Sequence, residues 1–263
     1  ADPSLTYESS VNLVTGDDFV GELSRASGED VNTYAILQNT LAIDDGNEGK
    51  NYDLTFVGGE LDITKRLITL AADAVSKTYG DADPTLSVSI TSGSLGSATV
   101  SDTLADVTGT LSRQAGQDVG SYDVELGSGA KSANYAITFE TDNNAFVIDP
   151  RAITVTADDL TKVYGDADPS LTYESSVNLV TGDDFVGGLS RASGEDVDVY
   201  AITQNTLSIN DGNEGKNYDL TFVGGELDIT KRLITLTADA VSKTYGDTDP
   251  TLSVSITSGS LGS

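Results

Sequence analysis

Two acidic loops contain the residues best suited to bind a metal ion. Each loop gathers carboxylate and amide oxygens within a few residues, in two copies: Asp44, Asp45, Asn47 and Glu48, and Asp211, Asn213 and Glu214. Calcium takes about six to eight oxygen ligands of this kind. The spacing does not match an EF-hand loop, however, and Asn210 stands in the second copy where Asp44 stands in the first. Two interpretations stay open, a calcium site and a solvated loop, and the pattern favours the solvated loop.

Paired carboxylates could also perform catalysis. Asp17-Asp18 and Asp183-Asp184 could in principle supply the acid and base of a glycoside hydrolase. Adjacent residues of a strand or turn point apart, however, and the chain has no Trp to stack on a sugar. The chain also contains no His and no Cys, which excludes a Cys–His or Ser–His relay and a thiolate-bound metal. The sequence therefore predicts that the chain is not an enzyme.

A third candidate is the string Tyr-Gly-Asp-x-Asp-Pro, which occurs three times. Its residues are Tyr79, Gly80, Asp81, Asp83 and Pro84; Tyr164, Gly165, Asp166, Asp168 and Pro169; and Tyr245, Gly246, Asp247, Asp249 and Pro250. The glycine permits a positive φ, and the proline fixes an extended exit into a strand. We expect the tyrosines to pack inward. The pattern favours a structural turn; the alternative is that the paired acids bind a hard cation.

These candidates lie in a tandem array. Residues 1–97 recur as residues 167–263 with eight differences, and the Tyr-Gly-Asp strings are spaced by 85 and 81 residues. We predict a partial repeat lacking its start (1–65), two complete repeats, type B (66–150) and type A (151–231), and the start of another (232–263). Because the chain contains no Met and starts and stops inside repeats, we expect it to be an internal part of a longer polypeptide.

Within one repeat, short segments alternate apolar and polar residues, which is the pattern of half-buried strands. In the type A repeat these are residues 152–157, 171–174, 186–193, 200–202, 207–209, 218–223 and 226–230. Helical turns are expected only at 177–185 and 101–107. The sequence predicts an all-β fold of small β-sandwich or β-grasp-like repeats. No Gly- or Pro-rich linker separates them at 147–152 or 227–236, so we expect a stiff array.

The Tyr-Gly-Asp string, the Arg-x-Ile-Thr before it and the Gly-x-Asp-Val-x-x-Tyr after it resemble the MBG domain (YGX type). The resemblance implies an extracellular β-rich module from large bacterial surface proteins, including filamentous-haemagglutinin-like adhesins. It brings no catalytic residues. Residues 92–100 of the type B repeat depart from the pattern, because that segment is longer and rich in Gly and Ser.

Charge limits the partners of this chain. It has 42 acidic and 14 basic residues, a formal net charge of −28, so nucleic acid and anionic membranes should repel it. Neighbouring repeats are the expected partners, and any host or cell-surface ligand is expected to bind elsewhere in the full protein. The sequence predicts a structural stalk of a bacterial cell-surface or secreted adhesin. The alternative is that the repeats themselves bind a glycan or a protein, although aromatic residues are only 6%.

Overall fold

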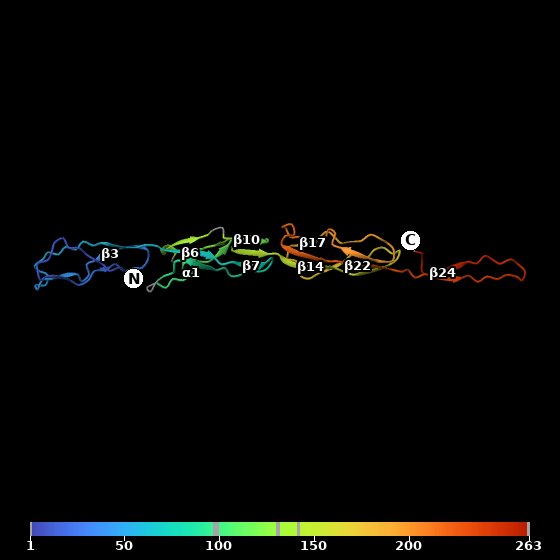
Figure 1. Ribbon diagram of the computed structural model, residues 1–263, viewed down its shortest axis with the longest axis horizontal. Helices are drawn as coiled ribbons and strands as arrows, with labels where there is room; N and C mark the ends of the chain where they lie inside the picture. Colours follow the sequence, from blue (N-terminus) through green and yellow to red (C-terminus); the bar gives the residue numbers. More distant parts are fainter. Residues whose placement is uncertain (1, 97–99, 130–131, 141–142, 262–263) are drawn as a thin grey trace. The chain divides into compact units, whose positions relative to one another are not determined.

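The computed structural model describes residues 2–96, 100–129, 132–140 and 143–261, and strands are its main elements (Figure 1). In that part of the chain the helices are α1 (Leu104–Thr108) and a 3₁₀ turn, η1 (Ser132–Asn134). The all-β prediction is confirmed. The chain divides into two compact units. Unit 1 comprises Ala1–Ser76, Asp83–Gly116 and Ser121–Val147, and unit 2 comprises Lys77–Ala82, Gln117–Gly120 and Ile148–Ser263.

The complete repeat in unit 2 is built around one long strand, β14 (Arg151–Ala157). Its alternating sequence places Ile153 and Val155 on one buried face. β14 is the middle strand of a three-stranded sheet, where it runs parallel to β21 (Tyr218–Val223) and antiparallel to β16 (Tyr173–Ser175). Both edges of β14 are therefore paired within the repeat.

A second sheet completes the core of the same repeat. Its strands are, in order, β15 (Leu160–Val163), β22 (Gly225–Thr230), β19 (Val199–Thr203) and β18 (Ser190–Arg191). Ile202 and Leu227 of this sheet pack against Ala157 of the first. The pair β17 (Asp184–Val186) and β20 (Ser208–Asn210) forms a separate small sheet. Side chains from two sheets thus meet in one core.

Unit 1 repeats this plan around β6 (Arg66–Ala72), which pairs with β8 (Val88–Ser92) and β12 (Tyr135–Phe139). Ile68 and Leu70 of β6 are buried in its core. The helix α1 is capped by Thr103 and packs Val107 into the same core. The remaining strands of this repeat are β7 (Val75–Thr78), β9 (Ser112–Arg113), β10 (Gly120–Tyr122), β11 (Val124–Glu125) and β13 (Phe146–Asp149).

The N-terminal repeat is less complete than its copy in unit 2. Its strands are β1 (Asp18–Val20) paired with β4 (Ala42–Asp44), and β2 (Ser24–Arg25), β3 (Asn32–Leu37) and β5 (Glu60–Ile63) in one sheet. Residues 7–9 and 52–57 are not strands, although the identical sequences form β16 and β21 in unit 2. The difference follows from β14, because residues 2–65 contain no counterpart of the strand that pairs with both.

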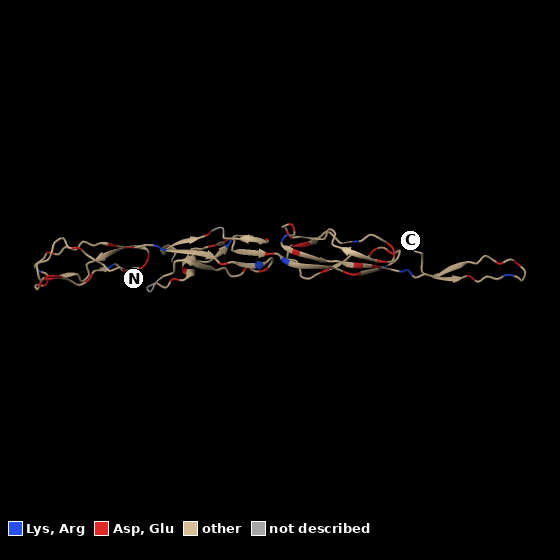
Figure 2. Ribbon diagram, in the orientation of Figure 1, with Lys and Arg blue, Asp and Glu red and all other residues tan. Residues whose placement is uncertain are grey.

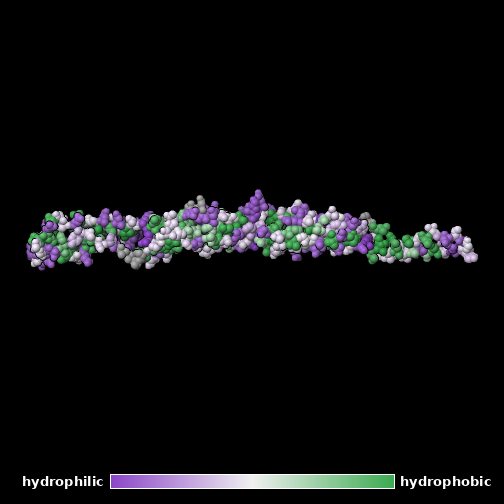
Figure 3. All heavy atoms as spheres, viewed as in Figure 1, coloured by the Kyte–Doolittle hydropathy of each residue, from purple (hydrophilic) through white to green (hydrophobic). Residues whose placement is uncertain are grey.

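The C-terminal segment contains two strands that pair only with each other. β23 (Thr235–Ala238) and β24 (Val254–Ser258) form an antiparallel pair in which every residue is exposed. Their near-identical counterparts β6 and β8 belong to the core sheet of unit 1. Hydrophobic atoms consequently lie on the surface of this segment, as Figure 3 shows, and Leu236 is 58% exposed.

Most of the predicted strands are present, and α1 confirms the helical turn expected at 101–107. The helical turn predicted at 177–185 is wrong, because that segment forms a hydrogen-bonded turn that leads into β17. The strand predicted at 186–193 is interrupted at Gly187 and Gly188, where β17 has ended and β18 has not begun. Of the Gly- and Ser-rich segment 92–100, residues 97–99 lie outside the described residues. Among the described residues, no helix is long and apolar enough to span a membrane.

Candidate functional site: the contacts between successive repeats

The Tyr-Gly-Asp turns of Tyr79 and Tyr164 lie where one predicted repeat meets the next. The glycines of all three turns have positive φ values, +84°, +84° and +95°, which confirms the expected left-handed turn. At Gly80 there is a second requirement, because a Cβ atom there would lie 2.4 Å from Cγ2 of Val180 in the following repeat. Glycine at this position therefore permits both the turn and the close approach of the next repeat, within unit 2.

An arginine at the start of each following repeat binds the turn. Nε of Arg151 donates to the carbonyl oxygen of Tyr79 at 2.9 Å, and Nη2 donates to Oδ1 of Asp81 at 2.7 Å. Arg232 makes the same pair of contacts, to the carbonyl oxygen of Tyr164 at 2.7 Å and to the carboxylate of Asp166. The planar guanidinium suits this two-point contact, which a lysine ammonium could not reproduce. The first acid of the motif thus binds the next repeat.

The tyrosine of the first turn packs on the following repeat. The ring of Tyr79, 8% exposed, meets the ring of Tyr218 edge to face, with centroids 5.5 Å apart. Both hydroxyls donate to Oδ2 of Asp183, at 3.1 Å from Tyr79 and 2.6 Å from Tyr218. Burial and the neighbouring carboxylate raise the pKa of Tyr79, and they raise the pKa of Tyr218 to about 12.

The prediction that all three tyrosines of the motif pack inward needs correction. Tyr164 is 44% exposed and Tyr245 is fully exposed, so the prediction is wrong for both. The physical reason is that Tyr79 is covered by a tyrosine and an aspartate of the following repeat, Tyr218 and Asp183. Residues 232–261 include Arg232, which binds the turn of Tyr164, but they contain no counterpart of this tyrosine and aspartate. Burial of this tyrosine is a property of the junction, and the repeat alone does not produce it.

An asparagine makes a second connection between repeats. Asn217 is fully buried; its Oδ1 accepts from the amide of Val119 at 2.8 Å, and its Nδ2 donates to Oδ1 of Asp118 at 3.0 Å. Asn134 makes the equivalent contacts in unit 1, with the amide of Val31 at 2.9 Å and with Asp30 at 2.8 Å. The Asn-Tyr of one repeat therefore binds the Gly-x-Asp-Val turn of the repeat before it.

The acidic loop holds this asparagine in place. Oδ1 of Asp211 accepts from the amides of Asn213 and Gly215, both at 2.8 Å, and Oδ2 accepts from the amide of Asn217 at 2.8 Å. Burial works against the charged form, but these backbone donors lower the pKa of Asp211 below its ordinary value. Asp45 accepts the same three bonds in the first copy. In both copies the aspartate carboxylate therefore holds the loop together by accepting hydrogen bonds from its backbone amides.

The calcium interpretation gains no support from this loop. Glu48 and Glu214 form ion pairs with Lys50 and Lys216 at 2.5 and 2.6 Å. Oδ1 of Asp44 lies 3.3 Å from the amide of Gly46. Within the described ranges, no group of three or more acidic residues is arranged to hold a metal ion. Calcium binding at the loops stays an untested prediction.

The second acid of the motif binds cations of its own repeat. Asp168 accepts from Nε of Arg191 at 2.7 Å and from Nζ of Lys162 at 2.6 Å, and these cations lower its pKa to about 2. Lys162 also reaches Glu195 at 2.5 Å. Corresponding pairs occur in the other repeats: Arg25 with Asp2, Arg113 with Asp83, and Lys243 with Asp249. The two acids of the motif therefore have different roles, one between repeats and one within a repeat.

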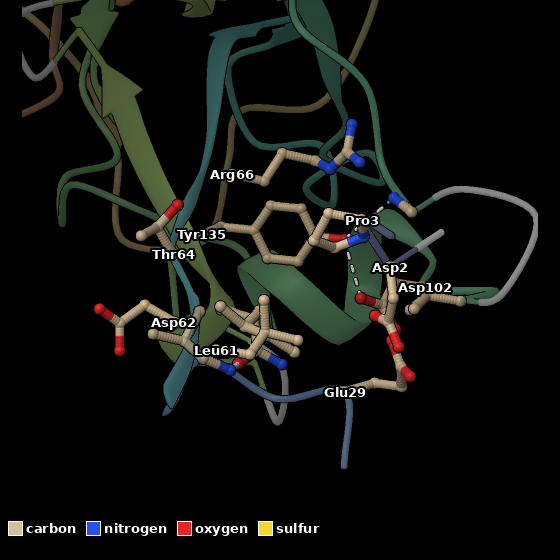
Figure 4. A pocket seen from close by; sticks show the side chains of 14 residues that line it. Asp2, Pro3, Glu29, Leu61, Asp62, Thr64, Arg66, Asp102 and Tyr135 are labelled. Atoms are coloured by element: carbon tan, nitrogen blue, oxygen red, sulfur yellow. Dashed lines mark hydrogen bonds between the residues drawn. The ribbon is translucent and has the colours of Figure 1, made fainter. Parts of the chain in front are cut away.

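A pocket in unit 1 repeats the same side chains around open space. Figure 4 shows Arg66, Tyr135 and Asp102, the counterparts of Arg151, Tyr218 and Asp183. The Tyr135 hydroxyl donates to Oδ2 of Asp102 at 2.8 Å. Arg66 donates to Oγ of Ser94 at 3.3 Å. Its counterpart Arg151 instead donates to the Tyr-Gly-Asp turn of the preceding repeat. The cavity measures about 250 Å³.

A family model matches three regions of the chain. It is described as MBG domain (YGX type) and matches residues 1–62, 68–146 and 153–228. The chain belongs to this family. Comparisons with curated proteins and with solved structures give no match. MBG domains are typical of extracellular surface proteins, and three in tandem are consistent with adhesin-like repeats.

The contacts described above join one MBG repeat to the next, and sequence reasoning did not assign them. The arginine and the Asn-Tyr pair stood out only as recurring landmarks, and Asp183 was considered only as part of a carboxylate pair. In the structure Asp183 accepts two tyrosine hydroxyls from two repeats. The available signal was recurrence, because polar residues that return at fixed places in every repeat can bind one another across repeats.

Proposed function

We propose that these MBG repeats form a structural stalk of a bacterial cell-surface or secreted adhesin and extend its adhesive region from the cell. Array length is then the useful property of the chain, and the repeats catalyse no reaction. The observation that carries this proposal is the recurrence of the same contacts between successive repeats. Arg151 and Arg232 bind the preceding Tyr-Gly-Asp turn, and Asn134 and Asn217 bind the preceding Gly-x-Asp-Val turn.

These contacts support a stalk because they restrict bending. The connection between β13 and β14 is the single residue Pro150, and the buried Asn217 lies beside it in space through its carbonyl bond to the amide of Arg151, at 3.0 Å. A hinge at this point would break the arginine, tyrosine and asparagine contacts together. Domains that move freely are joined by exposed linkers with few contacts across them. The junction at Pro150 differs from such linkers, because it is one residue long and several contacts cross it.

The charge supports the same function. Acidic residues occur along the whole ribbon and are not gathered in one part of it (Figure 2). Like charges distributed in this way keep β-rich chains from pairing through their edges, and salt screens their mutual repulsion. A surface property shared by all repeats fits a spacer better than a binding site in one of them.

The alternative is that the repeats themselves bind a glycan or a protein in cell adhesion. Such a site should present aromatic side chains on the surface, and most tyrosines here serve the contacts between or within repeats. We expect an array of glycans and of extracellular host proteins to give no specific signal with the purified chain. Reproducible binding to one ligand, lost on competition with that free ligand, would favour the alternative.

A further inference from the structure

The type A repeat begins and ends with chain segments that run side by side. β14 is parallel to β21, with Arg151 opposite Tyr218, and β15 is parallel to β22, with Leu160 opposite Leu227. In both ladders each residue lies opposite the residue 67 positions later, so the register is the same in the two sheets. The first segment of the repeat (β14 and β15) and its last segment (β21 and β22) therefore form one parallel alignment.

Both segments cross from one sheet of the core to the other without reversing. One residue separates β21 from β22, two separate β14 from β15, and the members of each pair belong to different sheets, so neither connection is a hairpin. The segments stay close at the crossing, where a Cβ atom on Gly225 would lie 2.7 Å from the carbonyl oxygen of Ala157. The chain therefore enters the repeat at Arg151, the first position of the alignment, and leaves it at Thr230, the last (Figure 1).

The strands at which the chain enters and leaves the repeat are both central strands. β14 has β16 on its other edge, and β22 has β19 on its other edge, both antiparallel. Their inward side chains, Ile153 and Val155 of β14 and Leu227 and Ile229 of β22, are at most 2% exposed. Neither strand can be removed from the edge of a sheet, and a strand that slides along its neighbour must move buried side chains through the core.

The direction of a pull decides how a parallel ladder breaks. A pull along the strands, on the start of one and the end of the other, loads the evenly spaced hydrogen bonds of the ladder together. A pull across the strands at one end loads these bonds one after another, so that each breaks alone. The preceding repeat is joined to the type A repeat at Pro150 and the following one at Lys231. Tension in the array is therefore a pull along the strands.

We propose that the parallel alignment is a load-bearing clamp, and that these repeats carry tension between the two ends of the array. The type B repeat has the same arrangement in β6 and β12, which are parallel from Arg66 opposite Tyr135 to Leu70 opposite Phe139. The inference rests on the proposed stalk function for the source of the tension. It goes further, because a spacer needs only length, whereas a tether must also resist unfolding along its axis.

Single-molecule force spectroscopy of the full chain tests the clamp. Because the natural chain has no Cys, two introduced cysteines define the points at which it is pulled. Asp149→Cys with Lys231→Cys, both at exposed positions, pulls the type A repeat along its strands. Only the residues between the two cysteines carry the tension. Their unfolding releases up to about 270–295 Å of extended chain, which identifies the event.

The matched control pulls the same repeat across its strands. It combines Asp149→Cys with Lys216→Cys, also exposed, and the two cysteines then lie two residues before Arg151 and Tyr218, the first pair of the alignment. The clamp predicts a mean unfolding force at least about threefold higher along the strands than across them at the same pulling speed, because the ladder bonds share the load only in the first direction. Equal forces, or a higher force across the strands, would overturn the proposal.

The Cys-free chain, pulled by tags at its two ends, provides a second measurement. Its two complete repeats are then loaded along their strands, and the clamp predicts that they unfold at a force similar to that of the Asp149→Cys and Lys231→Cys chain. Unfolding of both repeats at the lower force of the control would overturn the proposal.

The clamp and the stalk can fail separately. An elongated particle in solution scattering, combined with equal forces in the two directions, would overturn the clamp and leave the stalk. A compact particle whose repeats still unfold at a higher force along their strands would contradict the stalk and support the clamp.

Discussion

At the scale of single residues, the same side chain has different roles in different copies of the repeat. Asn217 is buried between two repeats, whereas Asn51, in the same loop sequence, is exposed. Tyr79 and Tyr245 differ in the same way. The loop that presents the asparagine could be recognised from its sequence, because Asp and Gly at these spacings form side-chain-capped turns. Its partner could not, because Val119 lies far away in the sequence and in another repeat.

Replacement of Asn217 tests the connection between repeats. Asn217→Ala leaves the part-buried amide of Val119 and the carboxylate of Asp118 without this partner, which should cost about 1–3 kcal/mol. Amide hydrogen exchange at Val119 should therefore accelerate by about tenfold or more. Asn51→Ala is the matched control and should leave exchange at Val119 unchanged. Equal protection of Val119 in both variants would contradict the assignment.

The ion pairs of Asp168 predict a pH dependence. Because Arg191 and Lys162 lower its pKa to about 2 in the folded chain, its carboxylate stabilises the fold fully above the ordinary pKa of 3.8. That contribution is lost as the pH falls from about 4 to 2. Asp168→Asn should therefore be less stable than the natural chain to urea at pH 7, and the difference should shrink on acidification through that range.

Asp2→Asn provides the comparison for this titration. In the described contacts Asp2 accepts from Arg25, and its pKa is lowered mainly by that bond. The loss of stability at pH 7 should be smaller than for Asp168→Asn, which removes a partner of both an arginine and a lysine. A difference that stays constant between pH 7 and pH 2 would show that Asp168 acts through packing and not through its charge.

At the scale of elements, local sequence predicted strands well where both neighbours of the strand are present. The alternation in residues 152–157 corresponds to β14, and residues 218–223 correspond to β21. The identical Tyr-Asp-Leu-Thr-Phe-Val at 52–57 is not a strand, so the local pattern alone does not decide the structure. A strand requires a partner for its backbone groups, and no reading of a single segment can supply this information.

Leu70 and Leu236 form a matched pair for this effect. They occupy the same position of Arg-Leu-Ile-Thr-Leu, but Leu70 lies in the core of unit 1 and Leu236 is exposed. Leu70→Ala should lower the free energy of unfolding by about 2–5 kcal/mol. Leu236→Ala should change it by less than about 0.5 kcal/mol in dilute solution. Urea unfolding measures both, and similar losses in the two variants would contradict the difference in packing.

At the scale of the whole molecule, the repeat unit was the strongest prediction from sequence. The family matches at 1–62, 68–146 and 153–228 follow the periodicity of the Tyr-Gly-Asp strings, and the predicted boundaries 1–65, 66–150 and 151–231 stay a prediction in their details. The contacts at the junctions add what periodicity could not: a physical reason for successive repeats to hold a fixed relation. That the array is stiff in dilute solution stays a prediction.

Small-angle X-ray scattering of the dilute chain tests the stalk most directly. A compact chain of 263 residues would have a radius of gyration of about 18 Å. A stalk held by the junction contacts should give a value well above this, with the scattering profile of a long narrow particle. A radius of gyration close to 18 Å, with the profile of a compact globule, would contradict the stalk.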